Sequence, residues 1–360
     1  MLNILFDYQI FSLQEFGGIS RYFSEISWRI NRHEGIEASV FCPLSVNHYL
    51  TSGEKRLKFK IPLLPKTGKL IQLVNRSASR IYAKLRRFDI VHKTYYLDHG
   101  NAGRPTVITV YDMINEIYPH FFPDDESLKR QKIESIKNAD AVICISHNTK
   151  KDLLHFIDID PERVFVTHLG FPDLPYDQHS SINIKGPFIL YVGKRGGHKN
   201  FSQLIRGFAA SKKLKSDFHI VCMGDLPFDK DEIAFFHEVD LNVDMIHHIA
   251  GDDRQLASAY HLATAFVYPS LYEGFGIPVL EAMSCQCPVI CSNAGSLPEV
   301  AGQAAQLFDP SDVDAICYSL EKVLYSSQRL NELTAMGEKQ CKRFSWDRCA
   351  KETIDIYRSI

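Results

Sequence analysis

The sequence predicts an α/β protein with two doubly wound domains, each built on a parallel β-sheet. Three observations favour this fold class. The chain has 360 residues, which exceeds the length at which one hydrophobic core usually keeps growing. Short apolar runs alternate with longer segments of helical periodicity from one end of the chain to the other. A proline-containing segment with few apolar residues, 171–187, separates two series of such runs.

The strands are predicted from near-continuous runs of Val, Ile, Leu and Phe, which are typical of parallel strands buried on both faces. The first series covers residues 3–8, 38–42, 89–94, 105–111, 139–146 and 164–168. The second series covers residues 188–193, 218–223, 245–250, 265–269 and 288–291.

The domain boundaries follow from the two series. We expect a first domain over 1–172, a linker over 173–187 and a second domain over 188–343, with a final segment, 344–360, that crosses back to the first domain as a helix. Because doubly wound domains bind ligands at the carboxyl ends of their strands, the expected binding site is a central cleft between the two domains.

The composition is that of an ordinary globular protein, with 45% hydrophobic and 23% charged residues. A net charge of −2 does not favour nucleic acid as a partner. Asp7 interrupts the N-terminal apolar stretch and no basic region precedes it, so no signal peptide is expected. The nine cysteines lie mostly in apolar runs and indicate a cytoplasmic protein. No Cys-x-x-Cys pair exists among Cys285, Cys287 and Cys291, so they do not indicate a metal site.

The segment with the clearest chemical pattern is 268–283, which reads YPSLYEGFGIPVLEAM. A strand ends in it, a glycine-containing loop follows, and a helix starts near Ile277 with Pro278 in its first turn. The free N–H groups and the dipole at such a helix N-terminus form a site for a diphosphate. Glu273 lies in the loop and Glu281 on the helix, so they can contact different parts of one extended ligand.

This segment resembles the Glu-x7-Glu motif of family 4 retaining glycosyltransferases, which have the two-domain GT-B fold. The resemblance implies that Glu273 lies against the donor sugar and that Glu281 accepts hydrogen bonds from the ribose hydroxyls. It also implies a lining for the sugar and the diphosphate, made of Gly274, Phe275, Gly276 and Ile277.

Other segments match the same family. Residues 16–23 (FGGISRYF) resemble its glycine loop near donor phosphate and acceptor, through Gly17 and Gly18, although a plain turn explains a glycine pair equally well. Residues 191–200 (YVGKRGGHKN) resemble its phosphate-binding loop, in which Arg195 and Lys199 are expected to neutralise the leaving diphosphate. Lys194 is the alternative to Arg195, and a solvated charge cluster is the alternative to the whole site. Residues 141–150 and 295–299 match as architectural signatures.

One position departs from the family pattern. Residues 107–114 (VITVYDMI) resemble a strand that commonly ends in His-Asp beside the donor sugar, but Tyr111 replaces the histidine. A phenol with a pKa near 10 cannot perform imidazole acid–base chemistry at neutral pH. Asp112 is the candidate to take over that work, unless another residue performs it or the step does not need it. Tyr111 is expected to contact the acceptor. His92 on the preceding strand is either a second acceptor contact or a buried structural histidine.

No metal and no cofactor are expected. Asp158 and Asp160 fit the metal-binding Asp-x-Asp pattern of the other large glycosyltransferase fold, but they stand in a turn before Pro161, where aspartate and proline are favoured for local reasons. In the GT-B interpretation, Arg195, Lys199 and the helix N-terminus supply the positive charge.

A basic segment stands out in the first domain. Between positions 55 and 88 there are eleven Lys or Arg residues and no Asp or Glu. On a helical wheel an apolar stripe runs beside a basic row. The stripe contains Leu70, Val74, Ile81, Leu85 and Phe88, and the row contains Lys69, Arg76, Arg80, Lys84 and Arg87. Two interpretations remain open: docking on an anionic membrane surface through Arg76, Arg80, Lys84 and Arg87, or a helix packed on the core with a solvated basic rim.

The expected function is metal-independent transfer of a hexose, with retention, from a nucleotide diphosphate sugar to a glycan or lipid-linked glycan. The resemblance is nearest to bacterial mannosyl- and rhamnosyltransferases of O-antigen, lipopolysaccharide, capsule and exopolysaccharide synthesis, which implies GDP-mannose as donor. The expected location is cytoplasmic, peripheral to the inner face of the membrane. Alternatives are a sugar-nucleotide epimerase or a phosphorylase of similar fold, and a non-catalytic nucleotide-sugar-binding module.

Overall fold

The computed structural model describes residues 1–50, 56–60, 67–97, 103–123, 126–175, 182, 184–224 and 226–360, with only the backbone of 56–60 and of residue 83. The chain divides into two compact units. Unit 1 consists of Met1–Gly170 and Ser345–Ile360, and unit 2 of Phe171–Phe344. The predicted linker, 173–187, thus falls at the start of unit 2, and its residues 176–181 and 183 lie outside the described residues.

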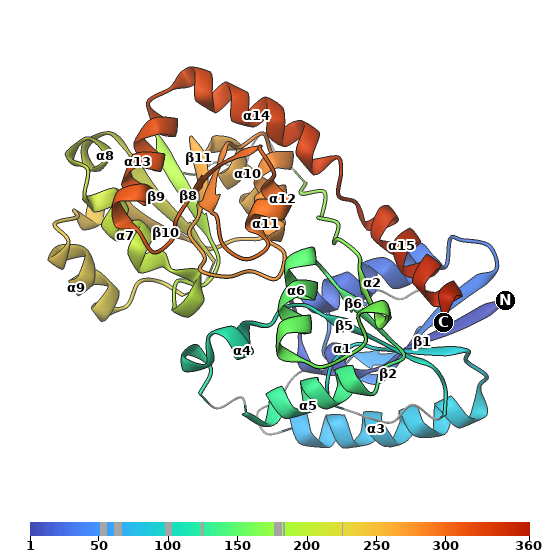
Figure 1. Cartoon of the computed structure of the whole chain (residues 1–360). Coiled ribbons are helices and arrows are strands. Elements are labelled where there is room, and N and C mark those ends of the chain that lie inside the picture. Colours follow the sequence, from blue (N-terminus) through green and yellow to red (C-terminus); the bar gives the residue numbers. More distant parts are fainter. Residues whose placement is uncertain are drawn as a thin grey trace. The chain divides into compact units, whose positions relative to one another are not determined.

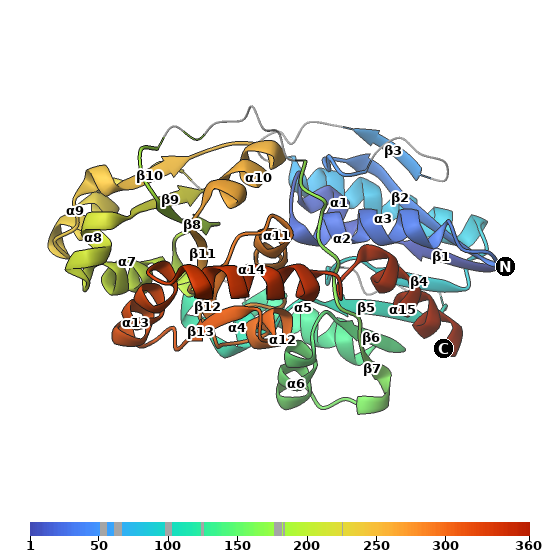
Figure 2. The same ribbon diagram turned by 90° about the horizontal axis from the view of Figure 1, so that it is seen from above.

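Unit 1 is a doubly wound α/β domain around a seven-stranded sheet of order β3-β2-β1-β4-β5-β6-β7, in which all neighbours are parallel. Its strands are β1 (Leu2–Phe6), β2 (Ile36–Ser45), β3 (Arg56–Lys60), β4 (Ile90–Lys93), β5 (Thr106–Val110), β6 (Ala141–Cys144) and β7 (Val164–Val166). Its helices are α1 (Gln9–Leu13), α2 (Gly18–Ile30), α3 (Gly68–Leu85), α4 (Ile114–Ile117), α5 (Glu126–Lys137), α6 (His147–Phe156) and α15 (Trp346–Ser359), which Figures 1 and 2 show around the sheet.

Unit 2 repeats this architecture with a six-stranded parallel sheet of order β10-β9-β8-β11-β12-β13. Its strands are β8 (Phe188–Val192), β9 (His219–Met223), β10 (Ile246–Ile249), β11 (Ala265–Tyr268), β12 (Val289–Ser292) and β13 (Ala305–Phe308). Its helices are α7 (Phe201–Ala209), α8 (Lys212–Asp217), α9 (Lys230–Glu238), α10 (Asp253–Leu262), α11 (Ile277–Ser284), α12 (Leu297–Ala301), α13 (Val313–Leu324) and α14 (Ser327–Cys341).

The predicted fold class, two doubly wound parallel-sheet domains, is confirmed. Every strand predicted from an apolar run is present, with ends that differ by about three residues at most. The sequence missed β3 and β13, and both are edge strands. An edge strand has a neighbour on one side only, so it does not need the continuous apolar run that marks a central strand. The five residues of β3 read RLKFK inside the basic segment.

The C-terminal helix returns to unit 1, as predicted. Helix α15 begins after Ser345, whose side chain caps it by accepting a hydrogen bond from the Arg348 N–H. It packs against α2, where the Trp346 and Tyr22 rings lie 6.2 Å apart. The start of α15 lies against Gly170, the last residue of the segment Met1–Gly170. A Cβ on Gly170 would lie 2.2 Å from the Trp346 backbone nitrogen. Only glycine fits this approach.

Gly170→Ala should therefore destabilise unit 1 by about 1–3 kcal/mol, the usual cost of overpacking, because backbone must move to admit the methyl group. Urea unfolding of the purified protein measures this loss. Gly68→Ala is the matched control, since a Cβ there meets nothing within 4 Å at the first residue of α3. Equal stability of the two variants would contradict the close approach.

Candidate functional site

The loop between β11 and α11 is shaped by Gly276. This residue precedes the helix with a φ of 106°, in the region that glycine adopts without strain, and a Cβ on it would lie 2.6 Å from Leu297 Cδ2. Pro278 follows in the first turn of α11, where a missing N–H costs no hydrogen bond. The predicted strand–loop–helix over 268–283 is therefore present, and it presents Glu273 from the loop.

Glu273 and Lys199 form the central ion pair of this loop. The Lys199 ammonium donates to Glu273 Oε1 at 2.7 Å and to the Tyr268 hydroxyl at 3.2 Å. The Glu273 side chain is 12% exposed and that of Lys199 is 22% exposed. Burial raises the pKa of Glu273, but the neighbouring Lys199 charge and its hydrogen bond outweigh this effect and hold the pKa below its usual value. Glu273 is consequently ionised at neutral pH.

The segment predicted as an architectural signature, 295–299, supports the Glu273 loop directly. Ser296 donates its hydroxyl to the carbonyl oxygens of Glu273 at 2.9 Å and Phe275 at 2.7 Å. Gly295 has a φ of 58°, and a Cβ on it would lie 2.9 Å from the Glu273 backbone nitrogen. These contacts fix the loop backbone on both sides of Gly274.

The basic loop after β8 is attached to the same region. Asn200 Nδ2 donates to the Pro269 carbonyl at 3.0 Å, and the Leu271 N–H donates to the His198 carbonyl at 2.8 Å. These bonds bring Lys199 to Glu273 although 74 positions separate them in the chain.

Arg195 does not join Lys199 in this arrangement. Its guanidinium forms a bidentate ion pair with Glu232 on α9, in which Nε donates to Oε1 at 2.6 Å and Nη2 donates to Oε2 at 3.0 Å. The guanidinium also lies 4.7 Å from the centre of the Phe228 ring. Arg195 is 8% exposed, whereas Lys194 is exposed. Glu232 is thus the partner of Arg195 in this structure, whereas Lys194, the alternative left open by the sequence, is exposed. That Arg195 neutralises the diphosphate stays a prediction.

Glu281 lies on α11, eight positions after Glu273, as the sequence predicted. It is 7% exposed and accepts a hydrogen bond from the Tyr260 hydroxyl at 3.2 Å. Burial and the Glu281 charge together raise the pKa of Tyr260 well above its usual value, so this phenol stays a donor. Tyr260 holds the Glu281 carboxylate in place, and no sequence motif predicted this partner.

In unit 1, the predicted glycine pair opens helix α2, with Gly17 before it and Gly18 as its first residue. An aromatic group flanks this loop: Phe16 is 62% exposed and stacks on His48 with ring centroids 4.3 Å apart. The Tyr49 ring packs edge-on against the Phe16 ring, with centroids 5.9 Å apart. The Arg21 guanidinium lies over the Tyr49 ring, 5.1 Å from its centroid. This group was not predicted from the sequence, in which its one local signal is Phe16 before the two glycines.

Tyr111 and Asp112 lie at the carboxyl end of β5 and line a cavity of about 100 Å³ in unit 1. Tyr95, Tyr96 and Lys132 line it as well. Tyr111 is 7% exposed, and its hydroxyl has no hydrogen-bond partner among the described residues. Burial raises the pKa of this phenol well above its usual value, so it remains protonated. A buried hydroxyl without a partner costs about 1–3 kcal/mol, which a ligand oxygen can recover.

His92 is not an acceptor contact. Its side chain is fully buried, Nδ1 bonds with the Tyr357 hydroxyl of α15, and Nε2 bonds with Thr109 Oγ1 at 2.8 Å. Burial lowers its pKa to about 3, so the ring is neutral at physiological pH. The alternative of a structural histidine is therefore the correct one: His92 joins α15 to the sheet.

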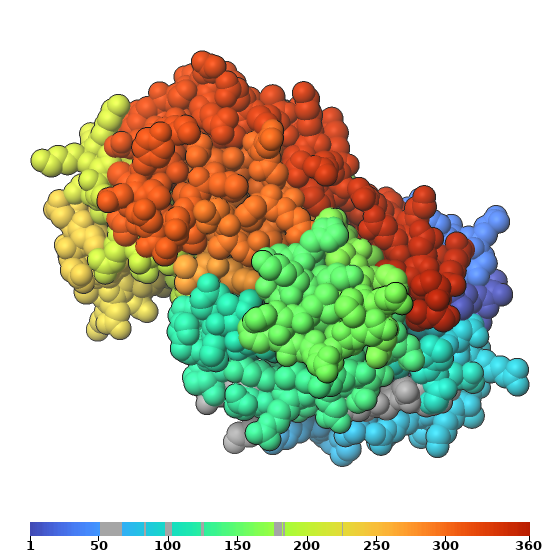
Figure 3. All heavy atoms as spheres, in the orientation of Figure 1, coloured from blue at the N-terminus to red at the C-terminus, as the bar shows by residue number. Residues whose placement is uncertain are grey.

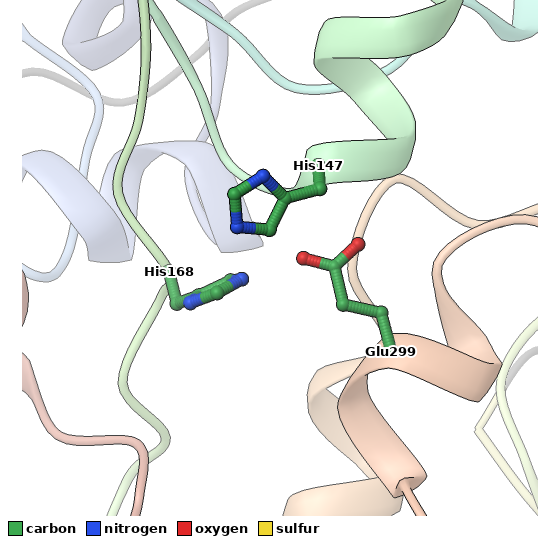
Figure 4. A group of neighbouring side chains, drawn as sticks. All are labelled: His147, His168 and Glu299. Atoms are coloured by element: carbon green, nitrogen blue, oxygen red, sulfur yellow. The ribbon is translucent and has the colours of Figure 1, made fainter.

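The structure also describes the Asp-x-Asp pattern and the cysteine cluster, neither of which was expected to bind a metal. Asp160 caps the turn at Pro161 by accepting a hydrogen bond from the Glu162 N–H at 3.0 Å, and Cys285, Cys287 and Cys291 are buried free thiols. His147 on α6 and His168 after β7 were not predicted as site residues. Their rings lie 5.4 Å apart in unit 1 (Figure 4). Glu299, also drawn there, belongs to α12 of unit 2.

Comparison with known proteins decides the family. The family model "Glycosyltransferase Family 4" matches residues 16–173, and "Glycosyl transferases group 1" matches residues 175–340. The O-antigen chain mannosyltransferase B of Escherichia coli is 30% identical over 280 residues, which cover 74% of this chain and 73% of that protein. This chain is a family 4 glycosyltransferase.

Other similarities agree with this assignment. The serotype-specific mannosyltransferase WbdA of Escherichia coli is 28% identical over 285 residues, which cover 74% of this chain but 35% of that longer protein. The solved sucrose-phosphate synthase of Thermosynechococcus elongatus has a TM-score of 0.78 at 18% identity and covers 100% of this chain and 99% of its own, which shows the shared fold. The family assignment makes the chain a glycosyltransferase and confirms the predicted GT-B fold.

Ser296→Ala should lower kcat/KM of this glycosyltransferase by roughly 10- to 100-fold, because a small displacement of the Glu273 loop misaligns the site. It should cost about 1–3 kcal/mol of unit 2 stability through two weakened carbonyl contacts. Steady-state kinetics with urea unfolding separates the two effects. Ser319→Ala on α13, equally buried in unit 2, is the control and should leave kcat/KM unchanged; a parallel loss in both variants would contradict the support role of Ser296.

Proposed function

We propose that this glycosyltransferase transfers mannose from GDP-mannose, with retention of configuration and without a metal ion, to a glycan or lipid-linked glycan acceptor in surface polysaccharide synthesis. The mannosyltransferase names of the two Escherichia coli relatives support the sugar. The single observation that carries the donor-site assignment is the Lys199–Glu273 pair, held between the loops after β8 and β11.

Hydrogen-bond capacity is the first reason to place a diphosphate at the Lys199–Glu273 pair. A lysine ammonium has three N–H donors, and Glu273 and Tyr268 accept two of those of Lys199. The third is left for a phosphate oxygen. Exposed Lys194 in the basic loop and the N-terminus of α11 after the Glu273 loop add positive potential. Arg195 then serves to hold the basic loop on α9 through Glu232.

The chemical step follows from this distribution of charge. When the bond between the anomeric carbon and the diphosphate breaks, negative charge develops on the leaving group and positive charge on the sugar ring. Lys199 stabilises the first, and the ionised Glu273 carboxylate stabilises the second. Such preorganised electrostatic stabilisation is usually the largest contribution to catalysis. The acceptor hydroxyl attacks from the face that the leaving group vacates, which retains the configuration.

Glu281 and the residues of unit 1 complete the proposal. Glu281, oriented by Tyr260, accepts from the ribose hydroxyls of the nucleotide, and Gly274, Phe275, Gly276 and Ile277 line the sugar and diphosphate. In unit 1 the buried Tyr111 hydroxyl donates to an acceptor or donor sugar oxygen, and Asp112 beside it is the candidate base for the acceptor hydroxyl. Gly17 and Gly18 let a sugar or phosphate approach the N-terminus of α2.

The proposed compartment is the cytoplasm, at the inner face of the membrane. The nine cysteines are all free, and free buried thiols are typical of a reducing compartment. Among the helices in the described part of the chain, none combines the length and the apolarity needed to cross a bilayer.

A donor assay tests the function. Among GDP-mannose, UDP-glucose, UDP-galactose and dTDP-rhamnose, only GDP-mannose should raise the midpoint of thermal unfolding strongly, since a ligand at 100 times its Kd adds about 2.7 kcal/mol. With a mannose-terminated acceptor, proton NMR should show an α-linked product, and activity should persist in excess EDTA.

Each of these measurements has an outcome that would contradict part of the proposal. Stabilisation by another nucleotide sugar would replace the donor. A β-linked product would contradict retention, and loss of activity in EDTA with recovery on adding Mn²⁺ would contradict the metal-free site. Turnover of GDP-mannose to another nucleotide sugar without acceptor would indicate an epimerase.

A further inference from the structure

Helix α3 turns the predicted apolar stripe outward. Four residues of that stripe are exposed at the surface of unit 1: Leu70 at 63%, Val74 at 40%, Ile81 at 60% and Leu85 at 78%. Leu73, which the stripe did not include, is 61% exposed. Exposed apolar side chains scattered singly are common, whereas these five lie on one helix and are called the apolar band below. We therefore expect a partner surface to cover the apolar band of α3.

A different face of α3 holds the helix on unit 1. Ile71 and Asn75 are buried, and Ala78 and Tyr82 pack on a core cluster with Phe41 and Phe88. The anchors are specific: Asn75 exchanges two hydrogen bonds of 2.8 Å with the backbone of Leu44, and the Tyr82 ring stacks on Phe41 at 3.9 Å. Helix α3 is thus packed on the core and its basic row is solvated, as one of the two interpretations had it. The packed face, however, is not the predicted apolar stripe, of which only Phe88 is buried.

The basic row runs along the outward side of the same band. On a helical wheel, Lys69, Arg76, Arg80 and Lys84 flank Leu73 on the side opposite the buried face, and all of these cations are exposed. Arg86 and Arg87, which follow the helix, are exposed too. Figure 3 shows light-blue atoms of this region on the lower surface of unit 1. The outward face of α3 is therefore both apolar and cationic.

We propose that α3 docks unit 1 on an anionic phospholipid surface, with Leu70, Leu73, Val74, Ile81 and Leu85 in the interface and the cations on the headgroups. Charge complementarity selects this occupant. The segment 55–88 has eleven Lys or Arg and no Asp or Glu, so a second copy of the same face is repelled, whereas anionic headgroups are attracted. The chain as a whole has a net charge of −2, so the attraction is local to this face.

Cosedimentation with vesicles tests the proposal. The wild type should bind phosphatidylcholine vesicles that contain phosphatidylglycerol and bind pure phosphatidylcholine weakly. Salt at 1 M should release the protein, because the Debye length falls from about 8 Å to about 3 Å. Replacing Arg76, Arg80, Lys84 and Arg87 with Gln should weaken partition roughly 100-fold or more.

Two matched controls make the outcome specific. Replacing the exposed Lys212, Lys230, Lys339 and Lys342 with Gln changes the net charge equally and should leave binding intact. Replacing Leu73, Ile81 and Leu85 with Ser should weaken binding at least tenfold, whereas the same change at the exposed Leu226, Leu262 and Tyr318 should not. Thermal unfolding verifies that the variants fold, since none of these side chains is buried.

Three results would overturn the proposal. The first is equal binding of the wild type to anionic and neutral vesicles. The second is equal loss in the α3 variants and their controls. The third is a wild-type dimer in sedimentation that the Ser variants dissociate without any change in vesicle binding, which would make the band an interface between copies. Because binding is measured without donor or acceptor, none of these results depends on the sugar that the enzyme transfers.

Discussion

The ion pair between Lys199 and Glu273 is the interaction on which the proposed donor site depends. It joins two loops 74 positions apart in the sequence, and each loop is independently fixed. Asn200 ties the basic loop to the end of β11, while Ser296 and Gly295 hold the backbone of the Glu273 loop. A partly buried ion pair is stable only when its geometry is enforced in this way, since both charges lose hydration. The same enforcement leaves one ammonium proton of Lys199 for a ligand.

The parallel sheet of unit 2 makes this pair possible. Strands β8 and β11 are hydrogen-bonded neighbours, and β12 follows beside β11. Their loops leave the sheet at the same edge because parallel strands end on the same side. Lys199 follows β8, Glu273 follows β11 and Ser296 follows β12. One topological constraint thus gathers a cation, a carboxylate and the residue that positions the carboxylate.

The sequence predicted these loops well because their signals are local. A glycine-containing loop, a proline in the first helical turn and charged residues after apolar runs are all visible without tertiary contacts. It left alternatives open where a tertiary partner decides the role. Arg195 and Lys194 are adjacent, and only Glu232 on α9 distinguishes them; His92 depends on Tyr357, 265 positions away. For α3, the helical wheel predicted the apolar stripe, but the contacts of Asn75 and Tyr82 with β2 determine which face of the helix is buried.

Calorimetric titration of GDP into Lys199→Gln tests the central claim most directly, because GDP carries the diphosphate without the sugar. If Lys199 holds the leaving group, affinity for GDP should fall roughly 10- to 100-fold, as expected for the loss of a charge-assisted hydrogen bond worth about 1.5–3 kcal/mol. Lys199→Arg should restore part of it, and Lys212→Gln, an exposed lysine of unit 2, should bind as the wild type does. Unchanged affinity in a folded Lys199→Gln protein would show that the diphosphate does not bind at the Lys199–Glu273 pair.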